Sequence, residues 1–264
     1  MVLVYISSFA KTFSLYNTSI IFLSMRFLLL IISIVVIGFT SLVSIPDSPF
    51  LIGGMTQGQI SALYPTAITP AGFTFSIWSL IYLSWIIAGI FVFLGKGTKD
   101  KKPIMLFSFA IICTTLWLIP WGFQMIWTSL LLMFLILGLL KYAFRLSRSA
   151  HPALKYSIEL TLGWINIATV ANITIYLVSL GFTGGGISET YWAIWILWLA
   201  LVLTAYYQCR FRSYTISLVF LWTMLWEWFA HDTPAQRYAI LLYSFITIFN
   251  MVYSYFKNKK TSHA

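Results

Sequence analysis

The stretch T-P-A-G-F-T-F-S-I-W-S-L-I-Y, residues Thr69 to Tyr82, decides the kind of fold that this chain adopts. It begins with a Pro/Gly turn and continues, without a charged residue, into a long apolar segment. Aromatic side chains at Phe75, Trp78 and Tyr82 fall in the first turns of that segment. An apolar run of about 20 residues is the length of a helix that crosses a membrane. The stretch therefore predicts irregular, aromatic-lined backbone at a membrane surface, followed by a spanning helix.

Composition places the whole chain in the membrane class. Hydrophobic residues make up 60% of the 264 residues and charged residues only 8%, whereas about a quarter of a soluble domain is charged. The net charge of +10 does not indicate a nucleic-acid partner, because the basic residues are dispersed at the ends of apolar segments, as membrane topology requires. Cys113 and Cys209 have no partner at metal-ligand spacing and are interpreted as small apolar residues.

The apolar segments predict an all-α fold, a polytopic membrane bundle of about eight transmembrane helices. Residues 1–24 contain no convincing span and are interpreted as an N-terminal extension with little structure, the alternative being an amphipathic segment on the membrane surface. Residues 25–183 are expected to form a five-helix membrane domain and residues 184–264 a three-helix extension. The eight expected spans are 27–46, 73–94, 104–120, 122–144, 157–180, 190–208, 214–230 and 238–256.

The positions of the charges predict the orientation. If the N-terminus is cytoplasmic, all of the 16 Lys and Arg residues except Arg237 fall on inner segments. An alternation this regular follows the positive-inside rule. We therefore expect an integral protein of a bacterial plasma membrane with both termini in the cytoplasm.

One face of the second span carries aromatic rings. Trp78, Tyr82, Trp85 and Gly89 follow helical spacings of four, three and four, with Phe75 near the edge of the face. Rings beside a glycine offer a slot for a planar apolar ligand. A close helix–helix contact is the alternative, because small residues allow helices to approach.

The fifth span contains the run G-W-I-N-I-A-T-V-A-N, in which Trp164, Ala168 and Asn172 share a face. An amide in hydrocarbon must find a hydrogen-bonding partner, so Asn166 and Asn172 should face protein or a wet cavity. For Asn166 an interhelical hydrogen bond is at least as plausible as ligand contact. For Asn172 the two interpretations are equally open.

These two segments resemble the tryptophan-rich sensory protein family, the TspO/MBR or translocator-protein group. The resemblance rests on Pro70, Gly72 and the aromatic residues that follow, on the W-x-x-x-A-T-x-x-N run, and on Trp117 followed by Pro120; it covers about residues 27–180. It implies a five-helix bundle in which a loop after the first helix covers a pocket for porphyrins or, in some members, sterols or drug-like ligands. The three helices after Gly186 look like the tail of longer bacterial relatives. By this likeness the residues that face or support the pocket are Phe75, Trp78, Tyr82, Trp117, Trp164, Ala168 and Asn172.

Two acids stand out in the apolar segments. Glu227 lies near the outer end of the seventh span, and we expect an interfacial carboxylate that reaches water; the alternative is a proton-coupling acid acting with His231. Glu159 follows Lys155 by four residues, which predicts a surface ion pair contributing less than about 1 kcal/mol.

Neither a metal-ligand cluster nor a nucleophile–base constellation nor a phosphate loop is evident in the sequence, so we expect no cofactor and no enzyme activity. The expected function is binding of a planar hydrophobic ligand such as a porphyrin, with a sensory or transport role. The expected partners are membrane lipid and that ligand, and a homodimer is compatible with the sequence. A small-solute secondary transporter is the alternative. Light-dependent porphyrin breakdown, which the resemblance also suggests, would use Trp78 and Trp164 as electron donors.

Overall fold

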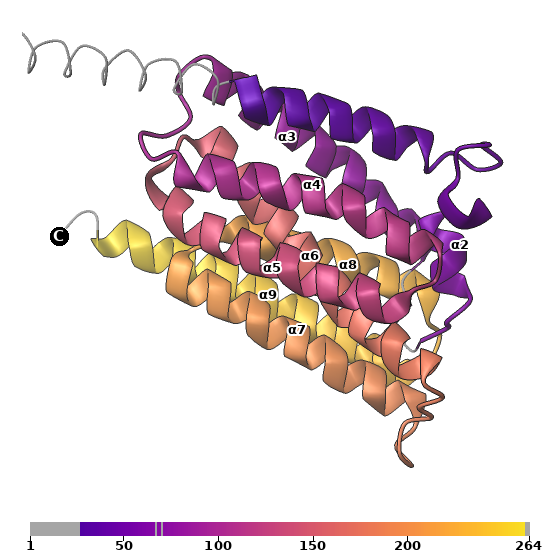
Figure 1. The fold of residues 1–264 in the computed structure, drawn as a ribbon. Coiled ribbons are helices and arrows are strands. Elements are labelled where there is room, and N and C mark those ends of the chain that lie inside the picture. Colours follow the sequence, from indigo (N-terminus) through magenta and orange to yellow (C-terminus); the bar gives the residue numbers. More distant parts are fainter. Residues whose placement is uncertain (1–26, 67, 70, 262–264) are drawn as a thin grey trace, which may run out of the picture.

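The structure is a computed structural model that describes residues 27–66, 68–69 and 71–261, with side chains to residue 257 (Figure 1). The expectation for residues 1–24 falls outside this range. The described secondary structure is entirely helical. In order it comprises the helix Phe27–Leu42, η1 Ile52–Gly54, α2 Gln57–Ala62, η2 Gly72–Ser76, α3 Ile77–Phe93, α4 Lys102–Gly122, α5 Ile126–Leu146, η3 Ser147–Ser149, α6 Pro152–Ser179, α7 Glu189–Phe211, α8 Tyr214–Ala230 and α9 Pro234–Thr261.

The fold class predicted from the sequence, an all-α polytopic membrane bundle, is confirmed. Each of the eight predicted spans coincides with one of the long helices. Within the described residues, six helices are long and apolar enough to cross a membrane. The helix Phe27–Leu42 and α8, which has 17 residues, are shorter. An α-helix of 17 residues is about 26 Å long, close to the thickness of the hydrocarbon layer.

Local sequence explains where the helices begin and end. α6 begins with Pro152 at its first position, where a missing N–H costs nothing, and the His151 side chain accepts a hydrogen bond from Ala153 N. The first helix ends at Leu42, four residues before the predicted end. Pro46 disfavours the helical conformation in the residue before it, Ile45, so a helix usually ends at or before that position. The chain reverses between α4 and α5 at Gln124, which has a φ of 55°.

The central helix of the bundle is α6, which packs against α3, α5, α7 and α8. The helices α7, α8 and α9 also pack on one another, and α7 and α9 lie on the side opposite the first helix (Figure 1). A single hydrophobic cluster joins residues of α3, α4, α5 and α6 to Tyr207, Ile216 and Val219 of the C-terminal helices. Helices α7 and α8 therefore share a core with α3, α4, α5 and α6, whereas buried residues of α9 pack with α7 and α8 in a second cluster.

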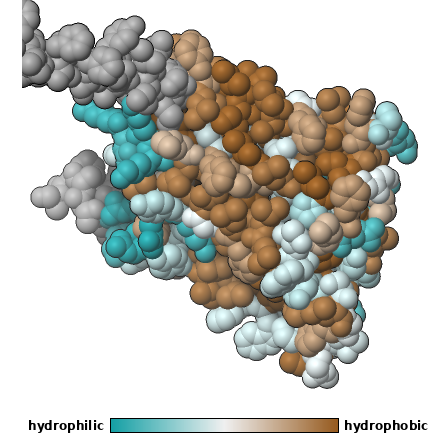
Figure 2. All heavy atoms as spheres, viewed as in Figure 1, coloured by the Kyte–Doolittle hydropathy of each residue, from teal (hydrophilic) through white to brown (hydrophobic). Residues whose placement is uncertain are grey.

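Loops that carry basic residues meet at one end of the bundle. The His151 N–H donates to the Gly97 carbonyl over 2.7 Å, and the Arg148 guanidinium lies 5.6 Å from the centre of the Phe211 ring. These contacts join the α3–α4 loop, the α5–α6 loop and the end of α7. Figure 2 shows hydrophilic side chains gathered at this end and hydrophobic ones along the sides. Which side of the membrane this end faces stays a prediction.

The contact between α6 and α8 depends on a glycine, and enlarging it should loosen the bundle. A Cβ atom on Gly163 would lie 3.1 Å from Val219 Cβ and 3.4 Å from Ile216 Cα. We expect Gly163→Leu to destabilise the protein by about 1–3 kcal/mol through overpacking. The measurement is thermal unfolding of the purified protein in detergent.

Gly138→Leu is the matched control for this substitution. A Cβ atom there meets nothing within 4 Å, and Gly138 also lies inside a helix. Both variants gain the same helix propensity. If Gly163→Leu unfolds at the same temperature as Gly138→Leu, the close approach of α6 and α8 does not contribute to stability.

Candidate functional site

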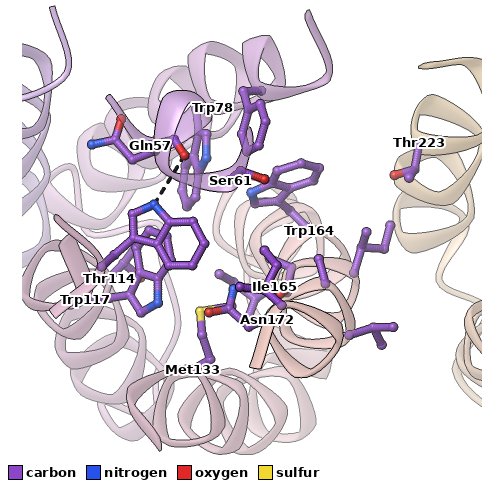
Figure 3. Close-up of a pocket in the computed structure, with 18 of the residues that line it drawn as sticks. Gln57, Ser61, Trp78, Thr114, Trp117, Met133, Trp164, Ile165, Asn172 and Thr223 are labelled. Atoms are coloured by element: carbon purple, nitrogen blue, oxygen red, sulfur yellow. Dashed lines mark hydrogen bonds between the residues drawn. The ribbon is translucent and has the colours of Figure 1, made fainter. Parts of the chain in front are cut away.

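A cavity of about 520 Å³ lies between α3, α4, α5 and α6 and continues toward α7 and α8. Its volume is typical of sites that bind small molecules. Figure 3 shows side chains from several helices converging on it. All the residues that the sequence analysis assigned to the pocket line this one cavity: Phe75, Trp78, Tyr82, Trp117, Trp164, Ala168 and Asn172.

Two helices form an aromatic wall. Trp78 of α3 and Trp164 of α6 have ring centroids 6.2 Å apart at an interplanar angle of 83°, and Phe75 approaches Trp164 at 6.1 Å. Tyr82 lies 5.5 Å from Trp78 along α3. Edge-to-face pairs of this kind are favourable beyond their buried area. Helical spacing predicted one such face on each of the second and fifth spans, and in the structure these two faces point toward each other.

The deeper part of the wall is closed by Trp85, which has 0% exposure and also lines the cavity. Its Nε1 donates to Thr161 Oγ1 over 2.9 Å. This bond joins α3 to α6 and satisfies the only polar atom of a buried indole. The position of the aromatic wall is consequently held by both packing and a buried hydrogen bond.

Two stacked indoles of α4 form another wall. The Trp117 and Trp121 centroids are 5.0 Å apart with an interplanar angle of 22°. Trp121 Nε1 donates to the Gln57 carbonyl over 3.3 Å, the bond drawn in Figure 3. Trp117 Nε1 is buried and has no hydrogen-bonding partner within the described part of the chain. A buried donor of this kind is uncommon in folded proteins.

Asn172 has surroundings that fit both interpretations left open for it, an interhelical hydrogen bond and a position where a ligand could contact it. Its Oδ1 accepts a hydrogen bond from Ser129 Oγ of α5 over 3.1 Å, and its Nδ2 donates to the Ala168 carbonyl over 3.0 Å. The residue thus makes an interhelical bond and lines the cavity at the same time. Asn166 does not line the cavity; its Nδ2 donates to the Leu162 carbonyl over 2.8 Å.

The segment between the first helix and α3 covers the cavity. Within it, α2 begins at a capping box in which Thr56 Oγ1 accepts from Gln59 N and Gln59 Oε1 accepts from Thr56 N. Gln57 and Ser61 of α2 line the cavity. Sequence analysis missed this helix, although the T-x-x-Q spacing is a recognised signal for a helix start.

The covering segment is held against α4 at a contact between two glycines. A Cβ atom built on Gly53 would lie 1.9 Å from the Gly122 carbonyl oxygen, and one built on Gly122 would lie 2.6 Å from the Ile52 carbonyl oxygen. Only glycine permits backbones to approach this closely. The Tyr64 hydroxyl adds a hydrogen bond to Gln124 Oε1 over 3.3 Å.

The structure has an aromatic pocket among apolar helices, and the segment after the first helix covers it. A comparison of the sequence with family models agrees with this architecture. The sequence model of a family described as "TSPO-like protein" matches residues 19–255. The chain belongs to the TSPO-like family. The match runs through the boundary at 183/184, so both the five-helix part and most of the three-helix extension lie within it. Comparisons with curated proteins and with solved structures found no match.

Two interpretations were left open for Gly89 of this TSPO-like chain, room for a ligand beside the aromatic rings or a close helix–helix contact. The first is wrong, because Gly89 does not line the cavity. A Cβ atom on Gly89 would lie 2.9 Å from Leu30 Cα. The glycine instead permits α3 to pack closely on the first helix, which is the use of small residues expected between membrane helices.

The expectation that Glu227 reaches water is also wrong. Its side chain is 1% exposed and lines the cavity. The turn before α3 packs on the C-terminal half of α8: Trp222 Nε1 donates to the Thr74 carbonyl over 3.1 Å, and the Phe73 and Trp226 rings are 4.6 Å apart. Because these contacts come from a segment far away in the sequence, the depth of Glu227 along its own helix did not predict its burial.

Glu159 differs from expectation in the same way. The predicted surface pair with Lys155 exists at 3.9 Å, but the Glu159 side chain is 1% exposed. Its Oε2 accepts a hydrogen bond from Ser213 Oγ over 2.8 Å. The turn between α7 and α8 brings Ser213 over the carboxyl group and excludes water, so the interaction is buried.

The TSPO-like cavity also includes residues that sequence analysis did not identify. They come from α4, α5, α6 and the C-terminal helices, and sequence analysis assigned none of them to the pocket, although it had singled out Glu227 as an acid in an apolar segment. Across the described residues, no group of three or more His, Cys, Asp or Glu side chains is placed to hold a metal ion. The additional lining residues include Thr114, Met133, Ile165, Leu197, Thr223 and Glu227.

Proposed function

We propose that this membrane protein binds a planar, largely apolar ligand in the cavity, with a tetrapyrrole as the first choice. The observation that carries the proposal is the facing pair Trp78 and Trp164 on α3 and α6, which borders a cavity of about 520 Å³. Flat rings at the cavity wall favour a flat ligand, because such a ligand can stack its face on one indole while the other indole, at 83° to the first, meets it edge-on.

Burial of apolar surface would provide most of the binding free energy, at about 25 cal/mol per Å². Polar groups would set the orientation of the ligand. Trp117 Nε1 is suited to this role, because a ligand acceptor would give it the hydrogen-bonding partner that it lacks among the described residues. Thr114 Oγ1 donates to the Ala110 carbonyl over 2.8 Å and can still accept a hydrogen bond from a ligand.

The role of binding is proposed to be sensory or to serve transport of the ligand. We place the basic end of the bundle, with both termini, on the cytoplasmic side of a bacterial plasma membrane, following the positive-inside rule. The covering segment and η2 lie at the opposite end, so the ligand would enter from the outer side or from the outer leaflet.

Titration with protoporphyrin tests the proposal. We expect saturable quenching of tryptophan fluorescence in the purified protein, and about tenfold weaker binding in Trp164→Leu, because one stacking surface is lost. Trp195→Leu is the control, since Trp195 is 60% exposed and lies outside the cavity. Quenching that never saturates, or that weakens equally in both variants, would contradict binding at this site.

A small-solute transporter stays the alternative, and the buried Glu227 carboxyl in the cavity favours it. Acids inside membranes often belong to ion or substrate pathways. Solute uptake into proteoliposomes that is lost in Glu227→Gln, with no saturable porphyrin binding by the parent protein, would favour transport over the proposed binding function.

A further inference from the structure

The cavity continues past the aromatic wall into a compartment built by the C-terminal helices. Leu197 and Ala200 of α7 and Phe220 and Thr223 of α8 line it. In Figure 3, Thr223 lies on a separate helix, on the side of Trp164 away from Trp117. The first five helices alone would therefore leave this side of the cavity unlined.

Glu227 lies on the same helix as Thr223, one turn further toward the outer end, and lines the same compartment. Within the residues that the structure describes, only His231 lies within ion-pairing distance, with Glu227 Oε2 and His231 Nε2 3.3 Å apart. A carboxylate offers about four acceptor positions. One partner on one oxygen leaves the group with unused capacity toward the cavity.

His231 contacts the carboxyl group from outside the cavity. It follows the last residue of α8, its side chain is 20% exposed, and it is not one of the lining residues. The contact with the Glu227 carboxyl group raises the pKa of His231 above its ordinary value, against the opposing effect of burial. The Thr69 backbone and the Asp232 charge act in the same direction as Glu227. Among the residues with described positions, Glu227 thus has a partner on the loop side and none on the cavity side.

Among the described residues that line the cavity, Glu227 is the only Asp or Glu, and none is Lys, Arg or His. The remaining polar groups of that lining are hydroxyls, amides, indoles and backbone. In a low-dielectric space a carboxyl group with acceptor positions open toward the cavity attracts a cation or an N–H donor more strongly than it would in water. It disfavours a second carboxylate for the same reason.

We propose that Glu227 and the C-terminal compartment form a subsite for a cationic or N–H-donating group on the ring ligand. This inference rests on the proposed function, because the ring must occupy the aromatic wall for its substituent to reach Glu227. The cavity then prefers uncharged or cationic planar ligands to carboxylated ones. A tetrapyrrole with two carboxylates would have to keep both at the mouth, away from α8.

Three probes with one ring system test the subsite: the cation 9-aminoacridine, uncharged acridine and the anion acridine-9-carboxylate. Binding is measured by equilibrium dialysis at pH 8 in an uncharged detergent, with protein-free micelles as the blank. We expect the parent protein to bind 9-aminoacridine about tenfold or more tightly than acridine, and the carboxylate more weakly than acridine. This comparison requires no variant.

Glu227→Gln should abolish the preference for the cation while acridine still binds. Glu159→Gln is the matched control, because Glu159 is an equally buried acid outside the cavity; it should retain the preference. Two results would overturn the proposed subsite and leave the ring-binding proposal intact. One is equal binding of the three probes to the parent protein, and the other is a preference for the cation that survives in Glu227→Gln. Failure of all three probes to bind overturns the ring-binding proposal itself.

Discussion

Ala168→Phe should weaken protoporphyrin binding by about 100-fold. Ala168 is half-buried, lines the cavity and lies one turn from both Trp164 and Asn172 on α6. A benzyl group there would occupy the space beside the indole that a flat ligand needs, and overpacking of about 1–3 kcal/mol corresponds to an effect of up to this size. The measurement is tryptophan quenching on titration with protoporphyrin.

The matched control is Ala205→Phe on α7. Ala205 is also half-buried, but it does not line the cavity. Both variants add the same side chain to a membrane helix, so any general effect on folding or detergent solubility is shared. If Ala168→Phe binds protoporphyrin as tightly as Ala205→Phe does, the ligand does not occupy the space between α3 and α6.

Gly53→Ala should detach the covering segment from α4. The new Cβ atom would lie 1.9 Å from the Gly122 carbonyl oxygen, which is backbone and cannot rotate away. We expect hydrogen exchange of the amides in residues 51–63 to become about 100-fold faster, which corresponds to a local loss of about 3 kcal/mol. Exchange measured by mass spectrometry on the purified protein gives this value directly.

Gly54→Ala separates the steric effect from backbone strain. Gly53 and Gly54 have φ angles of 72° and 77°, so alanine is strained by about 1–2 kcal/mol at either position. A Cβ atom on Gly54, however, meets nothing within 4 Å. Gly54→Ala should therefore have the smaller effect, and equal exchange rates in the two variants would mean that the glycine contact does not hold the covering segment.

Properties that depend on short stretches of chain could be predicted without coordinates. Hydropathy located all eight long helices, because the cost of placing polar groups in hydrocarbon acts on each segment separately. Helical spacing placed Trp78 and Tyr82 on one face and Trp164 and Ala168 on another, and the structure brings these faces together. That these residues bind a ligand stays a prediction until the titrations are done.

The same kind of reasoning was wrong about the two acids. Glu159 and Glu227 each lie near a helix end, where a local criterion predicts access to water. Ser213 covers the first, and the turn before α3 covers the second. Exposure depends on which distant segment packs over a residue, and no periodicity in one helix contains that information.

Sequence by itself thus determined the membrane class, the number and order of the long helices and the two aromatic faces. The first two follow from the transfer of nearby side chains between water and hydrocarbon, and the faces follow from helical spacing. Tertiary structure alone decided that α2 covers the cavity, that α7 and α8 extend it, and that the Glu227 carboxyl lines it. Those features arise from contacts between segments far apart in the sequence, from 64 residues for Trp121 with Gln57 to 148 for Trp222 with Thr74. Packing selects them only when the whole bundle has formed.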